Sequence, residues 1–384
     1  MQTRPLFPDL LPALALMAFA AALQMAGAST TAFAKDAAPH YRVIGYATGW
    51  NPAQDKDLDK IDTLIFAFAK VADGRVSLSD GAAKNLQVLV ALKRRDPALK
   101  VDVSVGGWGA GGFSEAARTA TGRKVFADSA AGLITEHGVD GLDIDWEYPG
   151  HDESGIASSP GDRANFTLLL KAVRASLDRA GATHGRAGDR YYTLSVAVAD
   201  GPFVSGIDIV AVDRYVDWFN LMTYDFCNSM TKETCHHAGL HASKLAPADA
   251  RTTDRAVAQF LAAGVPPRKL VIGAAFYGRE FGGVNPAHDG LYRHYGKYIG
   301  EIPWPKLKAG FIDKHGFVRH WDPQADAAWL WNPDSHAFIS YDDPESIAAK
   351  AAFVKAHHLG GIMYWEQGLD PTDELLEAIW RGLQ

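Results

Sequence analysis

Two rhythms of apolar and polar positions take turns along this chain from about residue 41 onward. Short runs of apolar, β-branched and aromatic residues are followed by longer stretches whose apolar residues recur at helical spacing. The short runs predict eight strands, at Arg42–Ala47, Thr63–Ala69, Lys100–Val105, Gly141–Trp146, Tyr192–Ala199, Trp218–Thr223, Leu270–Phe276 and Gly360–Trp365. The longer stretches predict helices, among them Ala82–Arg95, Arg123–His137, Arg163–Ala180, Thr253–Ala263 and Pro344–His358.

Eight strands separated by helices favour an α/β fold, a closed (β/α)8 TIM barrel over residues 41–384, rather than an open doubly wound sheet. A chain of 384 residues is long enough for one such barrel. A dinucleotide-binding sheet would open on a GxGxxG turn, and the first predicted unit lacks that motif.

One interval breaks the rhythm. Between Arg279 and Ser340 lie roughly 60 residues rich in Gly, aromatic residues and His, with no strong helical pattern. A loop of that length without secondary structure is uncommon, so we expect a small β-rich subdomain over residues 280–340, inserted between the seventh and eighth strands. Insertions there lie at the active face of a barrel and would form one wall of a cleft. An extended excursion is the alternative.

The beginning of the chain is typical of a targeting segment rather than of part of a folded domain. The run Leu10–Leu23 is apolar apart from Pro12, follows Arg4, and precedes small residues that include Ala32 and Ala34. It is shorter than the ~20 residues that span a bilayer. We therefore expect a cleaved signal peptide over residues 1–34, and a mature protein that is secreted or periplasmic and not bound to membranes. An uncleaved membrane anchor is the alternative.

Composition narrows the function classes. The chain has 38 Lys+Arg against 45 Asp+Glu, a formal net charge of -7, and 47% hydrophobic residues. These values argue against a disordered chain, a coiled coil and a nucleic-acid binder, which would show a basic excess. The 10 Trp suit either a packed core or the flat apolar rings of a sugar-binding cleft.

The chain has two cysteines, Cys227 and Cys235, eight positions apart. In an oxidising compartment a disulfide between them is favoured. A metal site that includes His236 and His237 is the alternative, but adjacent histidines on one loop rarely both bind a metal. We expect no metal and no cofactor.

The candidate chemistry is concentrated on one acidic strand. Asp143, Asp145 and Glu147 alternate with apolar residues, so their side chains share one face of the strand. In a barrel that face points inward, and the last residue emerges at the carboxyl-end rim. Three carboxylates in one row repel each other, so at least one should keep a proton near neutral pH. Asp140 has the opposite parity and is expected to be structural. A divalent-cation site and a solvated edge strand are the alternatives.

Five motifs in order give the chain a family resemblance. Asp140-x-x-Asp143-x-Asp145-x-Glu147 with Tyr148-Pro149 resembles the signature of glycoside hydrolase family 18, the chitinases. The other motifs that resemble this family fall at the third, sixth, seventh and eighth strands: Ser104-Val105-Gly106-Gly107-Trp108, Met222-Thr223-Tyr224-Asp225, Phe276-Tyr277-Gly278-Arg279 and Met363-Tyr364-Trp365. The resemblance covers nearly the whole chain after residue 41, and the interval at residues 280–340 is similar to the α+β insertion of the deep-cleft chitinase subfamily.

The resemblance implies a mechanism. Glu147 would be the general acid/base, and the substrate's own acetamide would act as the nucleophile. Asp145 would hydrogen-bond the acetamide N–H, and Tyr224 would hold its oxygen. Asp143 would share a proton with Asp145 as a coupled pair. The family's supporting residues for Asp143 are found here as Ser104 and Tyr46.

The same resemblance implies sugar contacts. Trp365 would form the apolar floor of the catalytic subsite, and Trp108 would flank the leaving-group side. Other expected cleft residues each have an alternative: Met222 as core, Asp225 as a helix N-cap, and Arg279 as the partner of an acidic neighbour. Tyr148 is similar to a family cleft residue.

We therefore expect a secreted, monomeric, endo-acting chitinase that acts on chitin or N-acetylglucosamine oligosaccharides. The alternatives are an endo-β-N-acetylglucosaminidase acting on glycoprotein glycans and a non-catalytic chitin-binding lectin. A lectin would typically have lost the acidic residue at Glu147. A peptidoglycan hydrolase also stays open.

Overall fold

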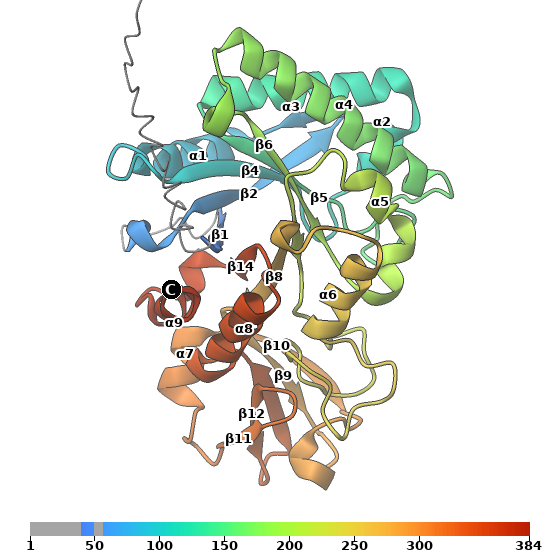
Figure 1. Ribbon diagram of the computed structural model, residues 1–384. Helices are drawn as coiled ribbons and strands as arrows, with labels where there is room; N and C mark the ends of the chain where they lie inside the picture. Colours follow the sequence, from blue (N-terminus) through green and yellow to red (C-terminus); the bar gives the residue numbers. More distant parts are fainter. Residues whose placement is uncertain (1–39, 50–56) are drawn as a thin grey trace, which may run out of the picture. The chain divides into compact units, whose positions relative to one another are not determined.

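A closed barrel of parallel strands forms the centre of the computed structural model, which describes residues 40–49 and 57–384 (Figure 1). The predicted signal peptide, residues 1–34, lies outside the described residues. The barrel strands follow the order β1–β14–β8–β7–β6–β5–β4–β2, and β1 pairs with β2 to close the ring. The predicted (β/α)8 barrel is therefore confirmed. Its strands are β1 Arg42–Thr48, β2 Thr63–Ala72, β4 Lys100–Gly106, β5 Gly141–Asp145, β6 Thr193–Val198, β7 Trp218–Leu221, β8 Leu270–Ala275 and β14 Gly361–Trp365.

Helices cover the outside of the barrel, and in Figure 1 α3 and α4 run side by side. The helices are α1 Asp80–Leu92, α2 Phe113–Arg118, α3 Ala120–His137, α4 Asp162–Thr183, α5 Ile209–Val212, α6 Thr253–Ala262, α7 Trp304–Gly310, α8 Pro344–Ala356 and α9 Glu374–Leu383. Short 3-10 helices are η1 Leu58–Lys60, η2 Gly188–Arg190, η3 Gly201–Gly206, η4 Pro267–Lys269, η5 Ala287–Gly290 and η6 Gln367–Leu369. The five predicted helices are all present, with ends displaced by up to a turn.

Strand β5 is buried on both faces. Leu142 and Ile144 point outward into the core that the barrel shares with its helices, where Ile134 of α3 and Leu170 of α4 also lie. The aspartates of the strand occupy the alternate positions and face the barrel interior. The edge-strand alternative is wrong, because β5 pairs with β4 on one side and β6 on the other. Burial of the apolar face thus fixes the direction in which the carboxylates point.

The interval between β8 and β14 holds a second, antiparallel sheet with the order β10–β9–β13–β12–β11. Its strands are β9 Tyr277–Gly282, β10 Lys297–Pro303, β11 Val318–Asp322, β12 Ala327–Asn332 and β13 Ala337–Tyr341. Together with α7 it forms an α+β unit between these two barrel strands. Its own core includes Phe281, Trp329, Trp331 and Phe338. Because a single residue separates β8 from β9, the insertion rises directly from a barrel strand.

The loop after β7 contains a disulfide between Cys227 and Cys235. The prediction of a disulfide is confirmed, and the alternative of a metal bound by these cysteines is wrong. Residues 40–49 and 57–384 contain no cluster of three or more His, Cys, Asp or Glu side chains arranged to hold a metal ion.

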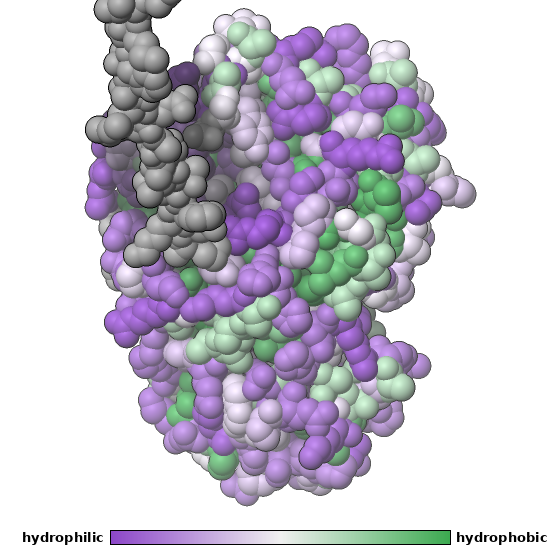
Figure 2. All heavy atoms as spheres, viewed as in Figure 1, coloured by the Kyte–Doolittle hydropathy of each residue, from purple (hydrophilic) through white to green (hydrophobic). Residues whose placement is uncertain are grey.

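Within the same described ranges, every helix is too short or too polar to cross a bilayer. The face seen in Figure 2 is mostly hydrophilic, with apolar residues in small scattered groups.

A short antiparallel strand, β3 Arg75–Ser77, extends the barrel sheet by pairing with the end of β2.

A buried ion pair fastens the end of the insertion to the barrel. Lys350 of α8 and Asp342, which follows β13, are 0% and 2% exposed. The ammonium of Lys350 donates to Asp342 and, at 3.3 Å, to the carbonyl of Gly273 in β8. The carboxylate of Asp342 also accepts from the backbone N–H of Ala275 at 3.0 Å.

Replacing Lys350 with Met should therefore lower the free energy of unfolding by about 3–5 kcal/mol, because it leaves the carboxylate of Asp342 buried without its cation. Chemical denaturation monitored by tryptophan fluorescence measures this loss. Lys171→Met, on the exposed face of α4, is the control and should change stability by no more than about 0.5 kcal/mol. Equal stability of the two variants would contradict the assigned role of the pair.

Candidate active site

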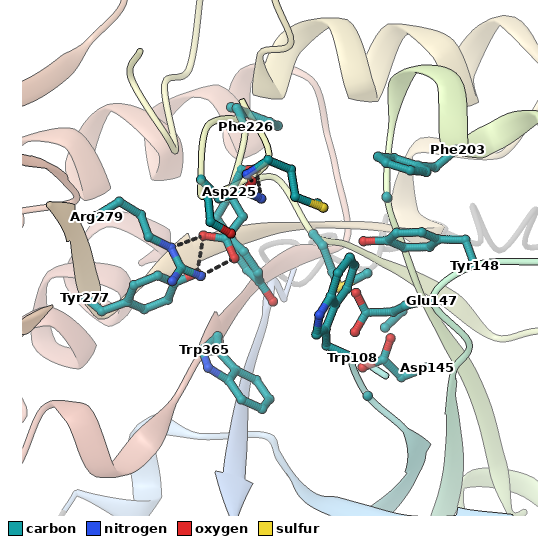
Figure 3. Close-up of a pocket in the computed structure, with 18 of the residues that line it drawn as sticks. Trp108, Asp145, Glu147, Tyr148, Phe203, Asp225, Phe226, Tyr277, Arg279 and Trp365 are labelled. Carbon is teal, nitrogen blue, oxygen red and sulfur yellow. Dashed lines mark hydrogen bonds and ion pairs between the residues drawn. The ribbon is translucent and has the colours of Figure 1, made fainter. Parts of the chain in front are cut away.

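A cleft of about 740 Å³ opens at the carboxyl ends of the barrel strands, with the insertion contributing one wall through Tyr277, Arg279 and Tyr298. Figure 3 shows the side chains that meet in it. Asp143 and Ser104 are the predicted site residues that do not line the cleft, and both lie completely buried in the barrel interior. The predicted residues that line it are Tyr46, Trp108, Asp145, Glu147, Tyr148, Met222, Tyr224, Asp225, Arg279 and Trp365.

Asp143 is the most completely hydrogen-bonded carboxylate of the acidic row. One of its oxygens accepts from the hydroxyls of Tyr46 and Ser104, at 3.0 and 2.7 Å. The other accepts from the Ser195 hydroxyl at 2.6 Å and from the Asn220 amide at 3.2 Å. Burial is the largest effect and leaves the pKa of Asp143 above its ordinary value, although these four donors lower it by stabilising the charged form. We infer that Asp143 carries the negative charge of the row.

Asp145 is in the opposite situation. Its side chain is 4% exposed, and its Oδ1 has no hydrogen-bond partner among the described residues. Burial, together with the nearby carboxylates of Glu147 and Asp143, raises the pKa of Asp145 well above its ordinary value. A protonated Asp145 is therefore the stable form beside an ionised Asp143. Its unpaired oxygen is free to accept a hydrogen bond from a ligand in the cleft.

Glu147 follows β5 and reaches the cleft beside Asp145 (Figure 3). Burial raises the pKa of Glu147 to about 7, even though the hydroxyl of Tyr148 lowers it. The negative charge of Asp225 adds to the increase, and the cation of Lys70 opposes it. A carboxyl group with a pKa near neutrality can both donate and accept a proton, as acid/base catalysis requires.

Tyr224 closes the cleft from the end of β7. Its hydroxyl lies 3.8 Å from the sulfur of Met363, and its ring packs on the backbone of Gly273. A Cβ on Gly273 would lie 2.8 Å from the Tyr224 ring, so glycine is needed there. This packing leaves the ring 8% exposed but still part of the cleft lining.

The insertion and the loop after β7 meet at Asp225. Its carboxylate accepts two hydrogen bonds from one edge of the Arg279 guanidinium, from Nε at 2.7 Å and from Nη2, and a third from the Tyr277 hydroxyl at 2.9 Å (Figure 3). The N-cap alternative for Asp225 is wrong, because the residue lies in a loop and α6 begins far downstream. Burial raises the pKa of Asp225, but His237 and Arg279 more than offset this and hold it well below its ordinary value.

Aromatic side chains form the apolar parts of the cleft. Trp365 is stacked on Phe68, with 5.7 Å between the ring centroids. Trp108 is 53% exposed and packs edge-on against Tyr148, whose ring in turn lies 4.5 Å from Phe203. A partly buried indole and an exposed indole in one cleft suit the binding of a ring that has both apolar faces and polar edges.

Sequence reasoning missed several residues of the site. Ser195 and Asn220 are polar residues on predicted strands, and their inward parity was a usable signal. Phe203, in η3, carried no signal because its position depends on a loop between elements. Lys70 was missed because β2 was predicted to end at Ala69, whereas pairing with β3 extends it to Ala72.

The cation-site alternative does not fit the acidic row. A divalent cation needs carboxylate oxygens that are free to bind it. Both oxygens of Asp143 are instead occupied by hydroxyl and amide donors. Asp140 lies at the opposite end of β5, where it is bound by Lys93 at 2.6 Å and by Arg186 at 3.0 Å.

Comparisons with known proteins point in one direction. The chain is 38% identical over 310 residues to Chitinase A1 of Niallia circulans, a match that covers 76% of this chain and 44% of that protein. It is 31% identical over 408 residues to Chitinase 1 of Aphanocladium album, covering 96% of this chain and 92% of that protein. The chain thus spans less than half the length of the first relative and nearly all of the second.

A solved structure and a family model agree with these relatives. The glycoside hydrolase family 18 N-acetylglucosaminidase from Paenibacillus barengoltzii is similar with a TM-score of 0.85 and 42% identity, over 90% of this chain and 100% of that chain. The model described as "Glycosyl hydrolases family 18" matches residues 42–370. The chain therefore belongs to glycosyl hydrolase family 18.

Proposed function

We propose that this protein is a secreted chitinase that hydrolyses β-1,4 linkages between N-acetylglucosamine units. The reaction retains anomeric configuration and uses the substrate's acetamide as nucleophile, with Glu147 as general acid/base. The observation that carries the proposal is the unequal state of the carboxyl groups at the cleft. Four donors stabilise the charged form of Asp143, which does not line the cleft, whereas the pKa of Asp145 is raised well above its ordinary value and that of Glu147 is raised to about 7.

Elimination among the carboxyl groups of the cleft supports substrate assistance. A retaining glycosidase of the usual kind needs an ionised carboxylate that attacks the sugar. Among the described residues that line the cleft, the carboxyl groups are Asp145, Glu147 and Asp225. The strongly raised pKa of Asp145 favours its protonated form, Glu147 must donate the proton, and Asp225 is bound by Arg279 and Tyr277. The acetamide oxygen of the sugar is the nucleophile that remains.

Two residues would position that acetamide. The free Oδ1 of Asp145 would accept its N–H, and the Tyr224 hydroxyl would donate to its oxygen. Both polar groups lie deep in the cleft, where few waters compete for them. Attack of the oxygen on the anomeric carbon would form an oxazolinium ion while Glu147 protonates the departing glycosidic oxygen. Glu147 would then deprotonate the incoming water.

The shape of the cleft and the names of the relatives support a chitin-type substrate. Trp365 would support the reacting ring, and Trp108 would contact the sugar on the leaving-group side. The relatives from Niallia circulans and Aphanocladium album are both chitinases by name. Secretion is supported by the predicted signal peptide and by the disulfide, which suits an oxidising compartment.

A second candidate is supported by one comparison. The structural neighbour from Paenibacillus barengoltzii is named an N-acetylglucosaminidase, and its full length is covered. An enzyme of that class would release single sugars rather than shorter oligomers. An endo-β-N-acetylglucosaminidase acting on glycoproteins uses the same site chemistry. The presence of Glu147 at the cleft disfavours a non-catalytic lectin.

The product ladder from a chitin hexamer separates these candidates. We expect oligomers of intermediate length early in the reaction, because a cleft with aromatic residues on both sides of Glu147 suits internal cleavage. The fully deacetylated hexamer should not be cleaved, since it lacks the nucleophile. Chromatography of both digests, beside a high-mannose glycopeptide, is the measurement. Early release of single sugars alone would favour the N-acetylglucosaminidase, and hydrolysis of the deacetylated hexamer would contradict substrate assistance.

Glu147→Gln should lower kcat on the chitin hexamer by roughly 10²–10⁴-fold, because the amide cannot donate a proton to the leaving oxygen. Binding of the hexamer, measured by calorimetry, should persist. Glu136→Gln makes the same chemical change on the exposed surface of α3 and is the matched control. A Glu147→Gln variant with near-normal turnover would overturn the assignment.

The pH profile should reflect the raised pKa of Glu147. The general acid must be protonated, so kcat/KM on the hexamer should fall as pH rises through about 7. The sign follows from the direction of the shift, because burial extends the protonated form to higher pH. Initial rates at subsaturating substrate measure the profile. A fall already complete at about pH 5, near the ordinary value of a glutamate, would show that burial does not control this group.

A further inference from the structure

The positively charged side chains that line the cleft differ in whether a carboxylate pairs with them. Its described cationic residues are Lys70, Arg251 and Arg279. Arg279 is paired with Asp225, and Arg251 with the buried Asp200. Lys70 forms no ion pair of hydrogen-bonding distance with the residues in the described ranges. Among these three described residues, Lys70 is therefore the cation that has no carboxylate in direct contact.

The backbone holds Lys70 close to the reaction centre. Its ammonium donates to the carbonyl of Gly106 at 2.7 Å and lies 5.2 Å from the centre of the Phe68 ring. Gly106 pairs with Asp145 in the barrel sheet, so closely that a Cβ on Gly106 would lie 1.9 Å from the Asp145 carbonyl oxygen. Lys70 is thus anchored between the aromatic floor and the strand end that carries the acids.

The positive charge of Lys70 acts on the carboxyl groups of Asp145 and Glu147. It lowers the pKa of both Asp145 and Glu147, against the larger effect of burial, which raises them. Desolvation lowers the pKa of Lys70 itself, and the two carboxyl groups raise it in return. The side chain stays exposed to the cleft, so the same positive charge acts on any ligand that enters.

A cleft lined by carboxyl groups can bind a positively charged sugar that it cannot cleave. A chitin unit that has lost its acetyl group carries an ammonium ion near neutral or acidic pH. The ionised Asp143 and the ionised fraction of Glu147 attract that ion, yet the unit lacks the acetamide that would react. Such a unit would bind in the catalytic subsite without being cleaved. A fixed cation beside the subsite opposes this unproductive binding through charge repulsion.

We propose that Lys70 is a specificity-determining residue that disfavours protonated glucosamine units at the catalytic centre of this cleft. The polymer it selects against is chemically identical to the substrate except for the missing acetyl groups. The inference rests on the proposed function, because it assumes that N-acetylglucosamine polymers enter the cleft.

Competition by a glucosamine hexamer tests the role of Lys70. The inhibition constant of the glucosamine hexamer is measured with the chitin hexamer as substrate, at mildly acidic pH and low ionic strength. Binding of the glucosamine hexamer is also measured directly by calorimetry. Lys70→Gln should bind the glucosamine hexamer about fivefold more tightly than the wild type, the effect of one screened charge at contact distance. The difference should shrink at high ionic strength.

Two controls separate charge from structure. Lys70→Arg keeps the cation and should resemble the wild type, whereas Lys84→Gln removes one charge from the exposed surface of α1 and should also resemble it. The proposal would be overturned if Lys70→Gln bound the glucosamine hexamer with wild-type affinity. It would also be overturned if Lys70→Arg bound that hexamer as tightly as Lys70→Gln does. The calorimetric comparison needs no turnover, so a wild type that fails to cleave the chitin hexamer would refute the proposed function and still leave the test of Lys70 decisive.

Discussion

The four hydrogen bonds that converge on Asp143 are the interaction on which the site depends. They come from β1, β4, β6 and β7, so a single charge in the barrel interior is held by strands from several sides of the ring. With that charge fixed, Asp145 and Glu147 cannot both ionise next to it at neutral pH. The barrel therefore supplies the chemistry of the site as well as its position, because it decides where the negative charge resides.

The insertion adds a wall without adding a carboxylate to the reaction. Its strand β9 brings Arg279 and Tyr277 to Asp225, and these contacts remove Asp225 from the set of groups that could attack a sugar. The buried pair of Lys350 and Asp342 anchors the other end of the insertion to β8. Tyr224 packs on the same strand at Gly273. The position of the wall and the position of Tyr224 are thus linked through β8.

Periodicity in the sequence was enough to predict the barrel and the inward row of Asp143, Asp145 and Glu147, because strand parity is a local property. The partners of these residues could not be predicted in the same way. Arg279 and Asp225 are 54 positions apart, and the choice between an ion pair and a sugar contact needed the fold. Lys70 became visible only through the pairing of β2 with β3, which is a tertiary contact.

The distribution of protons between the two buried aspartates tests the account most directly. Carboxyl carbon-13 NMR of the ligand-free protein, with signals assigned through Asp143→Asn and Asp145→Asn, would report which group is ionised at neutral pH. The account predicts an ionised Asp143 and a protonated Asp145. A protonated Asp143 beside an ionised Asp145 would contradict it, because the cleft would then contain a free carboxylate able to attack the sugar.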